Sequence, residues 1–154
     1  MIPQRILIAT DGSPAAKAAE ALGADLASMM SFVRPVNVVV ASWIHDVGHL
    51  TGAGGTIPPS VEAGDAERIS AAGADHVRRV VADGKGANDI AIEAKVIVSL
   101  TPGGGIIAEA HAAGTCSIII MGNRGHGGVT EALLGSVSQH VVREAHCPVM
   151  IARA

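Results

Sequence analysis

Apolar residues gather along the chain in five short runs that predict five β-strands. Most of these runs are nearly continuous in Val, Ile, Leu, Ala or Met, which is typical of strands covered on both faces in a parallel sheet. In the third run the apolar residues alternate with polar ones instead. The predicted strands span residues 5–10, 36–43, 92–99, 117–121 and 148–152.

Helical segments separate these runs. Ser13 is a favourable N-cap and Pro14 a favourable first helical residue, so the first helix is expected to continue to about Met30. The other predicted helices span residues 60–82, 106–113 and 136–145, and Gly114 suits the C-terminal cap of the third. Residues 44–59, rich in glycine and ending on two prolines, predict a long surface loop, and residues 102–105 are also interpreted as a loop.

Strands that alternate with helices predict a parallel sheet with helices on both faces, a three-layer α/β/α fold of the Rossmann-like kind. With 154 residues, the chain is expected to form a single domain over residues 1–154. Ligands of such sheets bind beyond the carboxyl ends of the strands, where the strand order reverses. Three segments can meet there: residues 10–13, the segment from Ser42 onward, and residues 122–128.

Composition narrows the possible partners. The chain has one Phe, one Trp and no Tyr, and its formal net charge is −3. Single-stranded nucleic acids are bound with aromatic rings and duplexes with a basic face, so no nucleic-acid partner is expected. No apolar stretch reaches the roughly 18 residues of a membrane span. The expected compartment is the cytoplasm, where Cys116 and Cys147 would be reduced residues of the core; a redox pair is the less favoured alternative.

The segment most informative about chemistry is residues 121–136, a glycine-rich loop between a buried strand and a helix. Glycines can direct several backbone N–H groups into one concavity, and the helix start adds free N–H groups and a positive dipole end. Arg124 and His126 could add donors, as could the hydroxyls of Ser136 and Ser138. The residues alone leave two interpretations equally open, a polyphosphate site or a loop whose glycines only turn the chain.

Two common phosphate-binding motifs are absent from the sequence. A P-loop needs Gly-Lys followed by Ser or Thr, but the one Gly-Lys pair, Gly84-Lys85, is followed by Gly86. The dinucleotide fingerprint should follow the first strand, where residues 11–14 read Asp-Gly-Ser-Pro and lack its second and third glycines.

The spacing Gly122-x2-Gly125-x9-Gly135-Ser136 resembles the nucleotide-binding motif of the universal stress protein family. The resemblance extends to the opening strand and turn at residues 6–13, the strand at 118–122, and the segments 134–138 and 147–151. It covers essentially the whole chain and is weakest over residues 44–91. Ser117 stands where the family often has Asp, and residues 102–105 depart from its usual loop, which affects the rim of the pocket.

This resemblance implies a UspA-like domain of the subgroup that binds ATP, with ADP or AMP as alternatives and Mg²⁺ accompanying the phosphates. Asp11 would then meet the adenosine, with Ala9 and Thr10 beside it and Ser42 near the adenine. The residues implied on the ribose and phosphate side are Met121, Gly122, Arg124 and Gly125. The residues implied at the phosphates are Gly135, Ser136, Val137 and Ser138.

The remaining candidate binding, metal and catalytic residues give weaker indications of a function. Asp11 could also serve only as a turn residue before the first helix. His45 and His49 lie in the predicted loop without a third ligand, so solvated histidines are expected rather than a metal site. No nucleophile, base and acid form a recognisable set, so the expected role is regulatory or in a stress response, with at most weak ATP hydrolysis. The alternatives are a slow ATPase or nucleotidyl transferase, and an interaction dimer with an empty pocket.

The last predicted strand suggests how copies of the chain associate. An apolar strand that ends the chain often lies at the edge of such a sheet, and an exposed edge can pair with another copy. Related proteins commonly dimerise through this strand, so a homodimer through residues 148–152 is expected.

Overall fold

The computed structural model describes residues 4–45, 59–84, 89–112, 114, 117–125 and 134–154. Within these described ranges, nine elements alternate strictly between strand and helix. They are β1 (Arg5–Ala9), α1 (Pro14–Ser31), β2 (Val36–His45), α2 (Pro59–Asp83), β3 (Ile90–Ser99), α3 (Pro102–Ala112), β4 (Ser117–Gly122), α4 (Ser136–Glu144) and β5 (Val149–Ala152).

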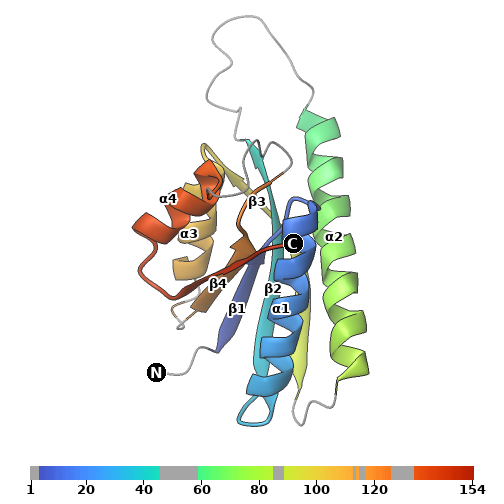
Figure 1. The fold of residues 1–154 in the computed structure, drawn as a ribbon. Helices are drawn as coiled ribbons and strands as arrows, with labels where there is room; N and C mark the ends of the chain where they lie inside the picture. Colours follow the sequence, from blue (N-terminus) through green and yellow to red (C-terminus); the bar gives the residue numbers. More distant parts are fainter. Residues whose placement is uncertain (1–3, 46–58, 85–88, 113, 115–116, 126–133) are drawn as a thin grey trace, which may run out of the picture.

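The five strands form one parallel sheet in the order β3-β2-β1-β4-β5. Helices α1 and α2 cover one face of this sheet, and α3 and α4 cover the other (Figure 1). The predicted α/β fold with a five-stranded parallel sheet is therefore confirmed. β5 lies at the edge of the sheet beside β4, as expected for the last strand.

Two apolar cores explain why the strand sequences are nearly continuous in apolar residues. Successive side chains of a strand point to opposite faces, and in β1 Ile6 and Ile8 enter the core beneath α1 and α2, while Leu7 enters the core beneath α3 and α4. In β4, Ile120 and Ile119 divide between the two cores in the same way. The interior strands therefore need apolar residues at every position.

The first turn and helix form as the sequence predicts. Ser13 is the N-cap of α1 and accepts a hydrogen bond from the Ala16 N–H through Oγ (3.2 Å), and Pro14 is the first helical residue. Gly12 precedes the cap with a φ of 77°, a backbone conformation that favours glycine. Gly114, which has a φ of 60°, likewise turns the chain shortly after α3.

Two predicted boundaries are wrong near the carboxyl edge of the sheet. Residues 102–105 are the first turn of α3 rather than a loop: Thr101 Oγ1 accepts a hydrogen bond from the Gly104 N–H (3.2 Å) and so caps the helix. Glycine at position 103 leaves room for α4, because a Cβ there would overlap the His140 ring. β2 continues for two residues beyond its predicted end, so His45 ends a strand instead of lying in a loop.

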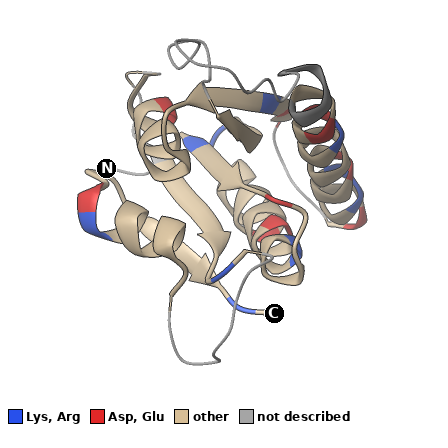
Figure 2. Cartoon of the chain, turned by 90° about the horizontal axis from the view of Figure 1, so that it is seen from above, with Lys and Arg blue, Asp and Glu red and all other residues tan. Residues whose placement is uncertain are grey.

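Charged side chains lie mainly on the outside of the helical layers. Figure 2 shows Lys, Arg, Asp and Glu intermixed along α2, the helix whose first turn is drawn in grey. Asp75 and Arg78 form one of its i,i+3 ion pairs, with 2.6 Å between Oδ1 and Nη1. Among the described residues, no helix is both long and apolar enough to cross a membrane.

Candidate functional site

The strand order reverses between β1 and β4, and a cavity opens at the carboxyl ends of these two strands. The chain continues from β1 to β2 and β3 on one side, and β4 and β5 lie on the other, which leaves the crevice that α/β sheets use for ligands. The cavity has a volume of about 480 Å³. All predicted site residues except Gly135 and Ser136 line it: Ala9, Thr10, Asp11, Ser42, Met121, Gly122, Arg124, Gly125, Val137 and Ser138.

Asp11 stands between the turn after β1 and the loop after β4. Its Oδ1 accepts a hydrogen bond from the Ser13 N–H (2.9 Å), so the turn interpretation of this residue is correct. Its other carboxylate oxygen faces Gly125, where a Cβ would overlap it. Asp11 therefore shapes the turn and lines the cavity at the same time.

The side chain of Thr10 is directed inward to a buried carboxylate. Its Oγ1 donates to Glu20 Oε1 (2.7 Å) and accepts from the Gly12 N–H (3.2 Å). Glu20 is fully buried, and its Oε2 also contacts Lys17 Nζ at 2.9 Å and His76 Nδ1 at 2.7 Å. This network holds the turn after β1 against α1 and α2.

Sequence reasoning missed Glu20. The available signal was its position on the buried stripe of an Ala-rich helix, where it continues the spacing of Ala16, Ala19, Gly23 and Ala27. A carboxylate at such a position needs hydrogen-bonding partners from other elements.

The two described glycines of the loop after β4 are explained by close approaches. A Cβ at Gly122 would lie 2.8 Å from the carbonyl carbon and Cβ of Ala15, at the start of α1. A Cβ at Gly125 would overlap the carboxylate of Asp11. Neither glycine has a positive φ, so close packing rather than an unusual backbone angle explains glycine at these two positions.

The first turn of α4 lies beside the cavity, and its first N–H groups make no hydrogen bond within the helix. Gly135 is its N-cap, with φ −64° and ψ 158°, and it brings no side chain that could cap the helix. The first intrahelical bond runs from the Gln139 N–H to the Gly135 carbonyl (2.9 Å). The N–H groups of Ser136, Val137 and Ser138 therefore have no acceptor within the helix, and the last two of these residues line the cavity.

The hydroxyl of Ser138 has a structural partner. It is buried and donates to the backbone oxygen of Gly122 (2.9 Å), so its hydrogen is not directed at a ligand as the sequence suggested. Ser136 is exposed and lies outside the lining of the cavity.

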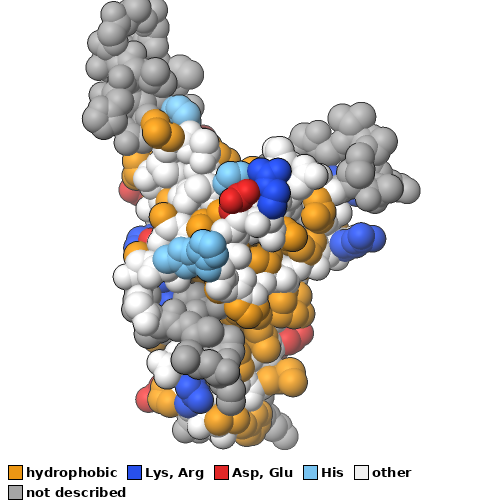
Figure 3. All heavy atoms as spheres, turned by 90° about the vertical axis from the view of Figure 1, so that its left-hand side faces the viewer, with side chains coloured by type: hydrophobic (Ala, Val, Ile, Leu, Met, Phe, Trp, Pro, Cys, Tyr) orange, Lys and Arg blue, Asp and Glu red, His pale blue; other side chains and the backbone are white. Residues whose placement is uncertain are grey.

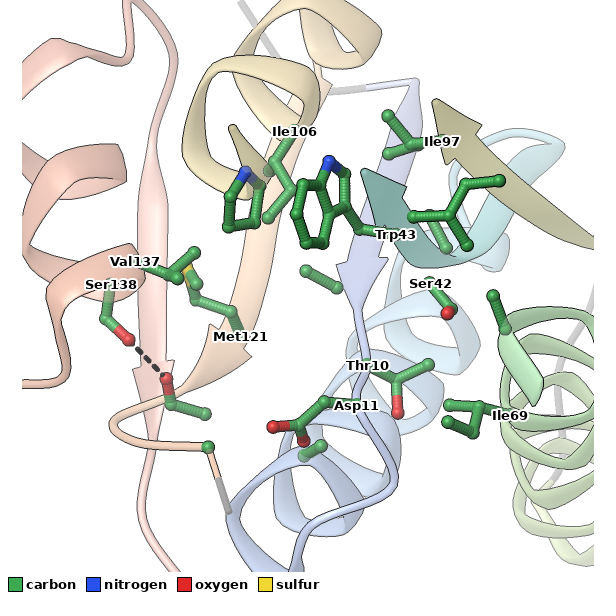
Figure 4. Close-up of a pocket in the computed structure, with 18 of the residues that line it drawn as sticks. Thr10, Asp11, Ser42, Trp43, Ile69, Ile97, Ile106, Met121, Val137 and Ser138 are labelled. Carbon is green, nitrogen blue, oxygen red and sulfur yellow. Dashed lines mark hydrogen bonds between the residues drawn. The ribbon is translucent and has the colours of Figure 1, made fainter. Parts of the chain in front are cut away.

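The end of the cavity away from Asp11 is apolar. Trp43 of β2 and Ile106 of α3 lie together there, with Ile97 of β3 close by, and Asp11 lies at the other end of the view (Figure 4). On the α2 side, Ile69 and Ala66 complete the wall. None of these apolar residues was predicted as part of the site. They lie on separate strands and helices that only the tertiary structure brings together.

The structure describes some of the candidate histidines and cysteines but not all of them. His45 lines the cavity, and its ring meets that of Trp43 edge-on. Among the described residues no group of three His, Cys, Asp or Glu is arranged to hold a metal. His49, Cys116 and His126 fall outside the residues that the structure describes.

The sequence profile of the Universal stress protein family matches residues 3–153. The chain belongs to this family. No protein with a curated description matches the sequence.

Solved universal stress proteins share the fold of this one at low sequence identity. The universal stress protein UspA from Lactobacillus plantarum is 21% identical with a TM-score of 0.70, over 99% of both chains. A universal stress protein solved in complex with cAMP is 21% identical with a TM-score of 0.68, covering 99% of this chain and 98% of its own. The protein from Archaeoglobus fulgidus in complex with dAMP is 21% identical with a TM-score of 0.56, over 99% of both chains.

In this universal stress protein, the glycine motif divides into two parts with different surroundings. Gly122 and Gly125 line the cavity and pack against Ala15 and Asp11. Gly135 lies just outside the lining and begins α4, and its N–H donates to the Asn123 carbonyl (2.7 Å). The motif thus joins the end of β4 to the start of α4 beside one cavity.

Proposed function

We propose that this universal stress protein binds an adenine nucleotide, ATP in the first place, in the cavity at the carboxyl ends of β1 and β4. The observation that carries the proposal is the start of α4, which has no side-chain cap, beside a cavity that also has an apolar wall around Trp43. Free N–H groups and the positive end of a helix dipole favour phosphate, while an apolar wall favours a base.

The size and lining of the cavity support a nucleotide of this class. Small-molecule sites usually enclose about 300–1,000 Å³ and are mostly apolar with a few polar groups, and this cavity has about 480 Å³. Arg124 joins its polar part and supplies a cation for phosphate oxygens. Solved family members bound to cAMP and dAMP support adenine as the base.

The phosphates of ATP are expected to carry Mg²⁺, and two carboxylates fit that expectation. Asp11 and Asp65 both line the cavity, and carboxylate oxygens together with phosphates are the usual ligands of Mg²⁺. When bound, the ion would neutralise part of the phosphate charge near these residues. ADP and AMP are the alternative ligands, because the same helix start can hold a shorter phosphate chain.

The nucleotide is expected to regulate the protein rather than be consumed. Among the described residues, Asp11 is a carboxylate that faces Gly125 of the glycine loop, and its Oδ1 accepts from the Ser13 N–H, which suits positioning more than proton transfer. We propose a stress-response or signalling role in the cytoplasm, in which occupancy of the cavity shifts a conformational or partner equilibrium.

The same proposal includes a homodimer formed through β5. β5 is an edge of the sheet, and the side chains of Val149, Met150 and Ile151 are only half-buried. On the adjoining side of the molecule, formed by α3 and α4, hydrophobic side chains gather beside histidines (Figure 3), and Val142 of α4 is 48% exposed. An open apolar edge of this kind is suited to pairing with another copy.

A substitution at the helix cap tests the nucleotide proposal without unfolding the protein. Gly135 has a backbone conformation that any N-cap residue can adopt. Gly135→Asp would cap α4 with its own carboxylate and place a negative charge where phosphate is expected. Calorimetric titration should show ATP affinity falling by about 100-fold, roughly 3 kcal/mol, while the thermal midpoint stays equal or rises. Gly135→Ala, whose Cβ would come no closer than 3.4 Å to another atom, is the matched control and should lose only a few-fold.

Equal ATP affinity in the wild type and Gly135→Asp would contradict the proposed phosphate position. A wild type that binds no nucleotide would contradict the function and favour an interaction dimer with an empty cavity. Phosphate release during incubation with ATP, abolished by Gly135→Asp, would instead identify a slow ATPase.

A further inference from the structure

We propose that Trp43 is the base-stacking residue of the cavity and gives it a preference for nucleotides over bare polyphosphates, with Ser99 as the residue that positions the indole. The inference rests on the proposed nucleotide function, which it deepens by naming the group that recognises the base. Neither Trp43 nor Ser99 belongs to the glycine motif or to the predicted site residues.

The sheet register places Trp43 at the apolar end of the cavity. In the parallel pairing of β2 and β3, Trp43 lies beside Ile97, and paired residues of neighbouring strands point to the same face of a sheet. Trp43 packs against the core cluster that contains Ile97 and Ile106, and all three residues line the cavity. Its ring is therefore supported from behind by aliphatic side chains of β3 and α3.

The indole is held in place by a hydrogen bond at its polar edge. Nε1 of Trp43 donates to Ser99 Oγ (2.7 Å), and Ser99 Oγ donates onward to the backbone oxygen of Thr101 (2.8 Å). α3 closes on this contact, because a Cβ at Gly105 would overlap Ser99 Oγ. The single polar atom of the indole is thus satisfied by the protein, and its π-face is the part that remains for a ligand.

A second ring extends the aromatic surface along β2. The ring of His45 meets Trp43 in a T-shaped arrangement, with 5.7 Å between centroids and 80° between planes, which is a favoured geometry for aromatic pairs. Both residues line the cavity. Together with the Ser99 bond, this contact limits the orientations that the indole can take.

Trp43 is the only Phe, Tyr or Trp residue of the chain that lines the cavity. The chain has one Trp, one Phe and no Tyr, and Phe32 is 62% exposed just after α1. In Figure 4 Trp43 and Ile106 lie at one end of the cavity, and Asp11 and Thr10 at the other. A ligand with a flat base and an anionic tail can therefore place its base against the indole and extend its tail toward the glycine loop.

Paired titrations of the full chain separate base recognition from phosphate binding. The probes are ATP and inorganic triphosphate, each titrated with Mg²⁺ into the wild type, Trp43→Leu, Trp43→Phe and the control Phe32→Leu. Stacking of a base on an aromatic side chain contributes the equivalent of about 5- to 150-fold in affinity. Trp43→Leu should lose about that much affinity for ATP and little for triphosphate. Trp43→Phe should lose only a few-fold, and Phe32→Leu should change neither.

The positioning role of Ser99 has a separate readout. Ser99→Ala frees the indole N–H, so ATP affinity should fall a few-fold with triphosphate affinity unchanged, and the tryptophan emission should shift because its hydrogen bond is lost. Ser99→Thr keeps the hydroxyl and should restore both. A variant that changed stability alone would alter the thermal midpoint but not the ratio of the two affinities.

The wild type itself supplies a measurement that does not depend on any variant folding. Because Trp43 is the only tryptophan, ATP should quench its fluorescence on binding, while triphosphate should not. The stacking proposal would be overturned if calorimetry showed ATP binding without any change in Trp43 fluorescence. It would also be overturned if Trp43→Leu bound ATP with unchanged affinity. Both outcomes would leave the proposed function intact. A wild type that bound neither ATP nor triphosphate would overturn the proposed function, and the role of Trp43 with it.

Discussion

The hydroxyl of Ser138 donates a hydrogen bond to the backbone oxygen of Gly122 across 2.9 Å, with the Asn123 oxygen at 3.3 Å as a second acceptor. Ser138 is the third residue of α4 and Gly122 the last of β4. This buried contact joins the helix start to the strand end around the cavity. The position of the free N–H groups of α4 thus depends on a side chain that need not touch a ligand itself.

Ser138→Ala should both destabilise the protein and weaken nucleotide binding. The loss of one buried hydrogen bond is expected to cost about 1 kcal/mol of unfolding free energy. A looser helix start should lower ATP affinity several-fold. Denaturant unfolding and calorimetry measure the two effects. The exposed Ser136 is the matched control, since Ser136→Ala removes a hydroxyl from the same helix turn outside the cavity lining; equal losses in both variants would contradict this prediction.

Gly122→Ala should reduce stability by about 1–3 kcal/mol, because its Cβ would lie 2.8 Å from the backbone and Cβ of Ala15 and force β4 away from α1. Gly64→Ala in α2 is the control, as a Cβ there meets nothing within 4 Å, and it should stabilise the helix by about 0.5–1 kcal/mol. Thermal unfolding of both variants checks the contrast. If the two variants were equally stable, the backbone at Gly122 would have to shift easily enough to accommodate a Cβ.

The ion pairs of Glu109 should make stability depend on pH. Burial raises the pKa of the Glu109 carboxyl, but hydrogen bonds and charges from Lys95 and Arg5 outweigh it and hold that pKa below its usual value. The nitrogen–oxygen distances are 2.8 Å to Lys95 and 2.6 Å to Arg5. A carboxyl whose pKa is lowered by folding stabilises the protein above its unfolded pKa of about 4.3, and this stabilisation is lost as the pH falls through the folded pKa.

Glu109→Gln should therefore lower the unfolding free energy at pH 7 by about 2 kcal/mol, and the difference from the wild type should shrink below about pH 4.3. Urea titrations at several pH values measure it. Glu93→Gln, at an exposed position of β3, serves as the control. If the loss of unfolding free energy in Glu109→Gln stayed constant down to acidic pH, the proposed charge effect would be excluded. Altered packing would then explain the loss.

Ile151→Pro should separate the proposed dimer. The oxygens of Pro148 and Ala152 accept hydrogen bonds from Ile119 and Asn123 on the β4 side. Backbone groups alternate along a strand, so the N–H of Ile151 points to the open edge, where proline is tolerated but cannot pair. Light scattering should measure twice the chain mass of 15.5 kDa for the wild type and 15.5 kDa for the variant. A wild type that already scatters as one chain would contradict dimerisation.

The strand and helix pattern was readable from sequence because its causes are local. Ile6, Leu7 and Ile8 are apolar in succession because an interior strand is buried on both faces, and Ser13 and Pro14 are favourable as the N-cap and first residue of the helix that follows. The alternation of strands and helices then predicts the position of the cavity, since the carboxyl ends of parallel strands share one edge.

The rest depended on contacts between residues far apart in the sequence. Trp43 became part of the cavity because the register with β3 places it beside Ile97 and within reach of Ser99. The partners of Glu20 come from the turn after β1, from α1 and from α2. Propensity and periodicity describe a residue's own segment and not the segment that packs against it. The sequence by itself therefore determined the elements and their order, while the tertiary structure decided which side chains line the cavity and which of them hold it in shape.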